Sequence, residues 1–224
     1  MDSGTERKLS HRADERFPMC STFKGAGRAA MLDRNSTAHL DLRVRYRAAD
    51  VVPFSPITES HVNDGLTIGE LCDAAIRYSD NTAGNLLLDD LGGSGEITTF
   101  ARSLGDRVTR LDRREPELNS AVPGDDRDTT SPRAIAAGYR ELVLGCRLDE
   151  VDRALLTGWL VENTTGDTRI RADSQRAGGS VTRPAPAITA WSMTSRLPGF
   201  WTQRRSCLLC CPHARPWTRR VTTC

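Results

Sequence analysis

Residues 66–93 read LTIGELCDAAIRYSDNTAGNLLLDDLGG and predict two helices joined by a short turn. In the first half, apolar side chains recur at helical spacing over residues 71–78, and Thr67 with Glu70 matches a capping box. The polar triplet SDN interrupts this pattern. A leucine-rich run follows and ends at Gly92, the residue type that most often closes a helix. The stretch therefore predicts a helical domain.

Further helical patterns follow on its C-terminal side. EITTFARSLG, residues 96–105, predicts a third helix. SPRAIAAGYRELVLG, residues 131–145, opens with Ser131 as N-cap and Pro132 at the first helical position, and LDEVDRALLTGWLVEN continues with another helix. Residues 110–130 are charged, contain proline and show no periodicity, so they predict a long loop of the kind that is often functional. Almost no strand pattern is left, so the chain as it stands is expected to be mainly α.

Composition limits the function classes. The chain has 224 residues, 38% of them hydrophobic, and a formal net charge of +2, which points to no particular partner. It contains no run of about 18 apolar residues, so no membrane span is expected. The start, MDSGTERKLSHRADERF, is polar and shows no signal peptide. Residues 173–224 carry eight arginines, no lysine and a single acid, which predicts a boundary near residue 172.

The first motif with a chemical meaning is STFK, Ser21 to Lys24. Residues three apart share a helix face, so the hydroxyl and the amine are expected to point the same way. A serine hydroxyl becomes a good nucleophile when a neighbour takes its proton, and a desolvated lysine with a lowered pKa can do this. The amides of the helix N-terminus would favour a developing oxyanion. Taken alone, the motif is also compatible with an ordinary helix start.

Two further motifs lie on a turn and on the long loop. SDN, residues 79–81, places a hydroxyl and an amide where they can relay a proton and hold a substrate, although an ordinary interhelical turn uses the same residue types. In REPELN, Glu115 and Asn119 are expected to hold a water between a general base and its positioning amide. A solvated charged loop is the alternative. Arg113 and Asp128 are expected to pair and close the base of this loop.

In this order and spacing, the motifs resemble those of class A serine β-lactamases of the actinobacterial type. The resemblance is carried by FPMCSTFK, by residues 40–93, by REPELNSAVPGDDRDTTSP and by NTTGDTRIRA, and it covers about residues 2–172. It implies the α+β fold of serine β-lactamases and penicillin-binding proteins. This chain would keep the helical domain of that fold and lack most of the antiparallel sheet domain.

The resemblance also implies a role for each site residue. Ser21 would be acylated by the β-lactam carbonyl, with Lys24 as a candidate acylation base and Ser79 as the proton shuttle to the ring nitrogen. Glu115, with Asn119, would activate the deacylating water, and whether Lys24 or Glu115 serves acylation stays open. The residues implied to bind the substrate are Asn81 for its side-chain amide, Phe54 at the mouth of the site and Arg169 for its carboxylate.

The sequence departs from the family pattern after Ala172. The family's lysine-threonine-glycine strand is expected where VTRPAPAITA stands, residues 181–190, and it is absent there. Codons for this stretch exist that, in the neighbouring reading frame, encode the family's residues, including its lysine-threonine-glycine motif. We therefore predict that one nucleotide was lost near residue 172 and that residues 173–224 are an out-of-frame, disordered basic tail. Residues 1–18 are interpreted as a remnant of the N-terminal hairpin of the sheet domain, and residues 19–172 as the helical domain.

A second departure is GAGR, residues 25–28. Two glycines in one turn weaken a helix by about 1 kcal/mol each, and Arg28 would lie on a buried helix face with no partner. Cys72 lies where some relatives have a disulfide partner, but Arg28 occupies the matching position, so no bridge is expected. CLLCCPH lacks a second cysteine pair at zinc-finger spacing, so we expect no metal and no cofactor.

The resemblance to class A serine β-lactamases implies hydrolysis of the β-lactam amide through a serine acyl-enzyme. Two alternatives stay open, namely a catalytically inactive remnant and a β-lactam acceptor that does not hydrolyse what it binds. The expected partner is a small-molecule β-lactam, with no nucleic acid, and the expected state is monomeric. The family implies a secreted or cell-envelope protein, whereas this chain as written, without a signal peptide, would stay in the cytoplasm.

Overall fold

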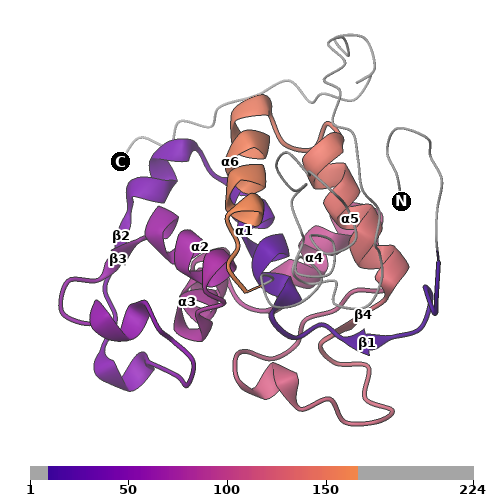
Figure 1. Cartoon of the computed structure of the whole chain (residues 1–224), viewed down its shortest axis with the longest axis horizontal. Helices are drawn as coiled ribbons and strands as arrows, with labels where there is room; N and C mark the ends of the chain where they lie inside the picture. Colours follow the sequence, from indigo (N-terminus) through magenta and orange to yellow (C-terminus); the bar gives the residue numbers. More distant parts are fainter. Residues whose placement is uncertain (1–9, 166–224) are drawn as a thin grey trace, which may run out of the picture.

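The computed structural model describes residues 10–165. Its helices are α1 (Phe23–Arg34), α2 (Ile68–Arg77), α3 (Asn81–Leu91), α4 (Gly95–Ser103), α5 (Pro132–Leu144) and α6 (Glu150–Val161). Its strands are β1 (Phe17–Pro18), β2 (Arg43–Val44), β3 (Leu66–Thr67) and β4 (Thr129–Thr130). Short 3₁₀ turns connect several of these elements (Figure 1). This content confirms the mainly helical fold that the sequence predicts for the described part.

The α2–α3 pair forms as its end signals predict. The Thr67 hydroxyl accepts a hydrogen bond from the Glu70 amide at 3.1 Å, and the Glu70 carboxylate accepts one from the Thr67 amide at 2.7 Å. These two bonds complete the capping box. Asp80 caps α3 by accepting from the Ala83 amide at 2.8 Å. Gly92 closes α3 with a φ of +102°, a conformation that costs glycine no steric strain.

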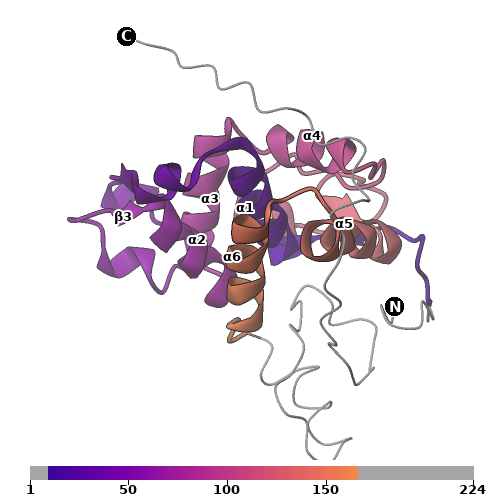
Figure 2. The same ribbon diagram turned by 90° about the horizontal axis from the view of Figure 1, so that it is seen from above.

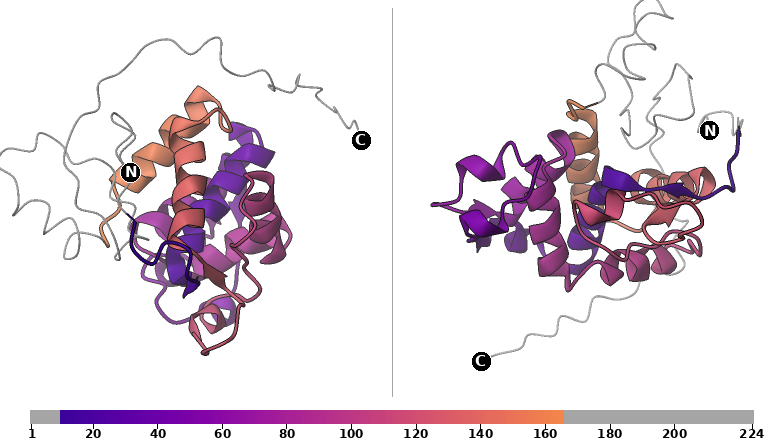
Figure 3. Two further views of the ribbon diagram at one scale, coloured as in Figure 1. Left: turned by 90° about the vertical axis from the view of Figure 1, so that its right-hand side faces the viewer. Right: turned by 90° about the horizontal axis from the view of Figure 1, so that it is seen from below.

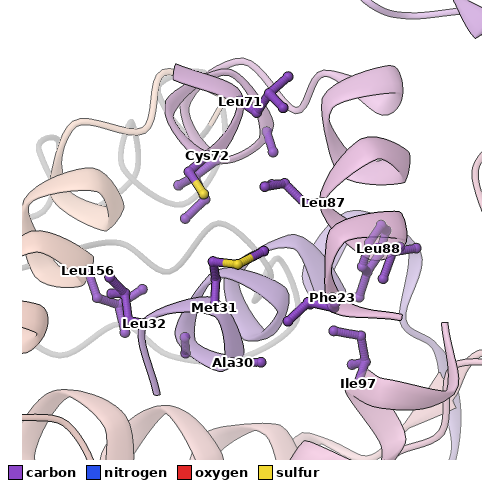
Figure 4. Close-up of a cluster of buried hydrophobic side chains, with 14 of the residues drawn as sticks. Phe23, Ala30, Met31, Leu32, Leu71, Cys72, Leu87, Leu88, Ile97 and Leu156 are labelled. Atoms are coloured by element: carbon purple, nitrogen blue, oxygen red, sulfur yellow. The ribbon is translucent and has the colours of Figure 1, made fainter. Parts of the chain in front are cut away.

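Helix α1 is the central element, and it packs against α2, α3, α4 and α6 (Figures 1 and 2). Helix α6 also contacts α2, and α5 lies beside α6 (Figure 3). The side chains that α1 buries meet leucines of α2 and α3 and Ile97 of α4 (Figure 4). Phe23 and Met31 are the largest apolar contributions of α1 to this cluster. The core therefore forms around the helix that begins next to Ser21.

The strands of the described part form two small antiparallel pairs. Phe17 of β1 faces Thr130 of β4, and Arg43 of β2 faces Thr67 of β3. The first pair joins the segment before STFK to the base of the long loop. The turn predicted for the hairpin of residues 1–18 lies outside the described residues, so that interpretation stays a prediction.

Several other predictions concern residues outside the described part. These are Arg169, the VTRPAPAITA stretch and the tail over residues 173–224, with the out-of-frame interpretation that depends on it. Within residues 10–165, no helix is long and apolar enough to cross a membrane.

Candidate active site

Ser21 and Lys24 lie on one face at the start of α1, as their spacing predicts. Ser21 belongs to the 3₁₀ turn Cys20–Thr22, which leads directly into α1, and Lys24 lies in the first turn of the helix. The Lys24 ammonium donates to the Ser21 hydroxyl oxygen at 3.1 Å. The structure refines the prediction in one respect, because Ser21 precedes the α-helix rather than lying within it.

Lys24 is a buried cation with partners on every side. Its Nζ donates to the Ser79 carbonyl at 2.7 Å, to the Ser79 hydroxyl at 3.2 Å and to the Asn81 side-chain oxygen at 2.7 Å. It also forms an ion pair with Glu115, with Nζ 3.3 Å from Oε1. Burial lowers the pKa of Lys24 more than the nearby Glu115 carboxylate raises it. A lowered pKa is what a lysine needs to accept a proton near neutral pH.

Glu115 brings the long loop to the same point. The Ser21 hydroxyl donates to its Oε1 at 3.3 Å, and the Asn119 amide donates to its Oε2 at 2.5 Å. The predicted pairing at the base of the loop is confirmed, because Arg113 Nε lies 2.5 Å from the buried Asp128 carboxylate. This loop therefore presents one carboxylate to both the nucleophile and an amide neighbour.

The SDN turn is held in a strained conformation. Ser79 has a φ of +59°, which non-glycine residues rarely adopt outside turns and functional sites. The Asn81 side chain donates to the Pro53 carbonyl at 2.9 Å, and its backbone amide donates to the Phe54 carbonyl at 3.0 Å. Phe54 exposes 66% of its surface next to this turn. Its role at the mouth of the site, and the substrate contact of Asn81, stay predictions.

Sequence reasoning missed three residues that support the site. Asn85 holds the Glu115 backbone from both sides, donating to its carbonyl at 2.8 Å and accepting from its amide at 2.9 Å. Gly84 leaves room for Lys24, because a methyl group there would come within 3.0 Å of the lysine Cε. Asp80 is fully buried and accepts hydrogen bonds from Ile57, Thr58 and Ala83. A polar Asn85 on the buried face of α3 is the one signal that could have suggested such a role.

The arrangement is that of a nucleophilic serine site. A serine hydroxyl, a buried lysine, a second serine and a carboxylate meet within hydrogen-bond distance, which suits nucleophilic attack by the serine on an acyl group. Within residues 10–165, no group of three or more histidine, cysteine or acidic side chains could hold a metal ion.

Comparisons with known proteins specify this class. The sequence profile described as the beta-lactamase enzyme family matches residues 1–186. The chain therefore belongs to the beta-lactamase enzyme family. The match continues past residue 172, and the boundary there stays a prediction.

Individual curated relatives support the same family assignment. Beta-lactamase AST-1 of Nocardia asteroides is 56% identical over 174 residues, which are 77% of this chain and 56% of the relative. A beta-lactamase of Mycobacterium tuberculosis is 55% identical over 174 residues, 76% of this chain and 57% of the relative. Beta-lactamase FAR-1 of Nocardia farcinica is 49% identical over 204 residues, 87% of this chain and 65% of the relative. The first two matches thus span little more than half the length of the curated relatives.

Solved structures show the same relationship. An ancestral class A beta-lactamase superimposes with a TM-score of 0.75 at 56% identity, covering 77% of this chain and 67% of that chain. The last common ancestor of Gram-negative class A beta-lactamases also gives a TM-score of 0.75 at 56% identity, with 77% and 66% covered. The helical arrangement described above is therefore that of class A beta-lactamases.

Proposed function

We propose that this chain hydrolyses β-lactams through an acyl-enzyme on Ser21. The observation that carries the proposal is the contact of the Ser21 hydroxyl with both Lys24, at 3.1 Å, and Glu115, at 3.3 Å. Two potential proton acceptors thus lie within reach of one nucleophile, in a site whose lysine is almost fully buried.

In the acylation step, Ser21 Oγ attacks the β-lactam carbonyl carbon and loses its proton either to the Glu115 carboxylate or to Lys24 in its neutral amine form. The amide C–N bond of the ring then breaks, and the ring nitrogen takes a proton from the Ser79 hydroxyl. Lys24 lies 3.2 Å from that hydroxyl and can replace the proton. The backbone amide of Ser21 supports the negative charge on the carbonyl oxygen.

In the deacylation step, Glu115 takes a proton from a water molecule that attacks the ester carbonyl carbon. The C–O bond to Ser21 then breaks, and Ser21 Oγ regains the proton from Glu115. Asn119 supports this role because its side-chain amide donates to the carboxylate oxygen that does not contact Ser21. Asn85 supports it as well, since its two bonds to the Glu115 backbone limit the movement of the carboxylate. Asn81 would hold the side-chain amide of the substrate, Phe54 would lie at the mouth of the site, and Arg169 would bind the substrate carboxylate.

The sequence contains no lysine-threonine-glycine triplet, which bears on the rate. In the family pattern this strand supplies the second oxyanion donor, and loss of one such donor lowers turnover by about 100- to 1,000-fold. We therefore expect slow turnover, with a monomeric protein acting on a small molecule alone. Secretion or a cell-envelope location is the expectation from the family.

The test is intact-protein mass spectrometry with benzylpenicillin, together with a chromogenic cephalosporin assay. We expect wild-type protein to gain the mass of one penicillin transiently and to release the hydrolysed product. The matched variants are Ser21→Ala, which should gain no mass, and Glu115→Gln, which should keep the adduct if Lys24 is the acylation base.

The other outcomes are equally informative. A stable adduct on the wild-type protein without product release would replace the hydrolase by a β-lactam acceptor. No adduct on folded wild-type protein would contradict the proposal and favour the inactive remnant. If Glu115→Gln forms no adduct while its fold is intact, Glu115 rather than Lys24 removes the Ser21 proton.

A further inference from the structure

Tyr139 of α5 is a buried side chain that reaches the turn carrying the nucleophile. It exposes 5% of its surface, and its hydroxyl donates to the Thr22 carbonyl at 3.3 Å, across 117 residues of sequence. Thr22 directly follows Ser21 in the 3₁₀ turn Cys20–Thr22. Burial raises the pKa of Tyr139, so its hydroxyl keeps its proton and remains a donor at neutral pH. Because it is buried, the tyrosine can act on the nucleophile only through this turn.

Gly25 provides the space that Tyr139 occupies. A methyl group at Gly25 would lie 2.0 Å from the Tyr139 hydroxyl oxygen and 3.0 Å from the ring carbon that bears it. A larger residue there would therefore displace the hydroxyl from Thr22. The neighbouring Gly27 differs, because a methyl group there would meet Ile97 at 3.4 Å, an ordinary contact distance. Of these two glycines in the GAGR segment, Gly25 is the one that a close neighbour requires.

The turn needs outside contacts because its backbone is strained. Cys20 has a φ of +43°, in the left-handed region that non-glycine residues rarely adopt. The Thr22 hydroxyl is buried and has no hydrogen-bond partner among the described residues, so it does not anchor the turn. A strained conformation persists only where neighbouring groups hold it. The Tyr139 hydroxyl is one such group, and the Asp128 carbonyl, which accepts from the Met19 amide at 2.8 Å, is another.

We propose that Tyr139 is a positioning residue for Ser21 and that Gly25 makes this role possible. The Tyr139 hydroxyl fixes the Thr22 carbonyl, and with it the backbone from which the Ser21 hydroxyl and amide project. Acylation is sensitive to this orientation, because a displacement of about 1 Å can slow a reaction about 100-fold. The effect on catalysis rests on the acylation proposed for Ser21, whereas the fixing of the turn does not.

The first experiment measures amide hydrogen exchange of the full chain without a β-lactam, so it reports on the turn independently of the proposed function. We expect Tyr139→Phe to speed exchange in the Cys20–Thr22 turn by about fivefold relative to α3, which is about what one neutral hydrogen bond contributes. A uniform loss of stability would instead speed both segments alike. An unchanged ratio in Tyr139→Phe would overturn the proposal.

The matched control for this exchange experiment is Tyr46→Phe. It removes the hydroxyl of another buried tyrosine, which donates to the Thr58 carbonyl at 2.7 Å. We expect the ratio of exchange in the Cys20–Thr22 turn to exchange in α3 to stay at its wild-type value. A control that speeds the turn as much as Tyr139→Phe does would also overturn the proposal.

The second experiment measures acylation of Ser21 by benzylpenicillin, from the rate at which the intact protein gains the adduct mass. We expect Tyr139→Phe to lower the acylation rate constant at saturating penicillin by about fivefold. The concentration for half saturation should stay unchanged, because a buried residue does not contact the substrate. Adduct formation at the wild-type rate, in a Tyr139→Phe protein whose turn exchanges faster, would overturn the positioning role.

The glycine variants test the space that the tyrosine needs. Gly25→Ala should lower the acylation rate constant by about 100-fold, because the new methyl group displaces the hydroxyl and disturbs the turn. The same change should cost much less when it is added to Tyr139→Phe, because the oxygen that it displaces is then absent. Gly27→Ala is the matched control and should acylate at the wild-type rate. Equal effects of Gly25→Ala in both backgrounds would contradict the role of Gly25.

The two readouts separate this inference from the proposed function. Wild-type protein that forms no adduct contradicts the acylation of Ser21, and the exchange experiment still decides whether Tyr139 fixes the turn. If Gly25→Ala does not fold, Tyr139→Phe removes a single oxygen atom and decides both experiments.

Discussion

Lys24 and Arg28 are two buried cations one helical turn apart on α1, and they meet opposite surroundings. Lys24 is 3% exposed and has Ser21, Ser79, Asn81 and Glu115 as partners. Arg28 is 0% exposed, and within residues 10–165 its guanidinium has no hydrogen-bond partner and lies against the ring of Trp159. The same helix thus contains Lys24, whose charge has polar partners, and Arg28, whose charge has none among the described residues.

The difference shows what makes a buried charge tolerable. The partners of Lys24 come from the turn before α1, the SDN turn and the long loop, and together they replace the water that the ammonium loses. Arg28 faces α2 and α6, whose buried side chains are mostly apolar. A site can therefore be formed correctly within one turn of a region where the same helix is destabilised.

The largest expected effect comes from removing the paired cation. Lys24→Met leaves the buried Glu115 carboxylate without its counter-charge and should lower the free energy of unfolding by about 3 to 5 kcal/mol. Urea denaturation followed by circular dichroism measures it. The double variant Lys24→Met/Glu115→Gln should recover most of the loss, because both charges are then absent. A single variant as stable as the wild type would show that the pair contributes nothing.

The same substitution at the unpaired cation should have the opposite sign. Arg28→Met removes an uncompensated charge and keeps an apolar side chain of similar length, so it should raise the free energy of unfolding by about 2 to 3 kcal/mol. The surface control is Arg140→Met on the exposed face of α5, which should change stability by less than about 0.5 kcal/mol. A loss of stability in Arg28→Met would mean that the contact with Trp159 outweighs the cost of burial.

A smaller effect should follow from loosening the loop that completes the paired site. Asn85→Ala leaves both the amide and the carbonyl of Glu115 without partners and should lower stability by about 2 kcal/mol. The exposed Asn63→Ala, on the turn before β3, is the matched control. If both variants unfold at the same denaturant concentration, the Asn85 bonds are not needed to hold the loop.

The smallest effect concerns a feature remote from both cations. Thr67→Ala removes the capping hydroxyl of α2 and should lower stability by about 1 kcal/mol without changing acylation of Ser21. The control is Thr99→Ala. Thr99 lies on the exposed face of α4, and its hydroxyl caps no helix. Acylation that falls together with stability in Thr67→Ala would mean that α2 transmits strain to the SDN turn.

The sequence predicted features of this protein that depend on near neighbours. The capping box of Thr67, the closing Gly92 and the shared face of Ser21 and Lys24 all arise within four residues, and the structure confirms each of them. The Arg113–Asp128 pair was also predictable, because complementary charges stood at the two ends of one loop. Local geometry follows from local sequence wherever one turn or one loop contains both partners.

What only the tertiary structure decided is which distant groups meet. Lys24 reaches Ser79, 55 residues away, and Ser21 reaches Glu115, 94 residues away, because the packing of α1 against α3 brings these segments together. The supporting contacts of Asn85 and Gly84 arise from the same packing. The sequence by itself identified Arg28 as a charge on a buried helix face and offered no partner for it. The packing of α1 against α2 and α6 decided that, within residues 10–165, no hydrogen-bond partner reaches its guanidinium. Burial and pairing are properties of the space between elements, so no local pattern contains them.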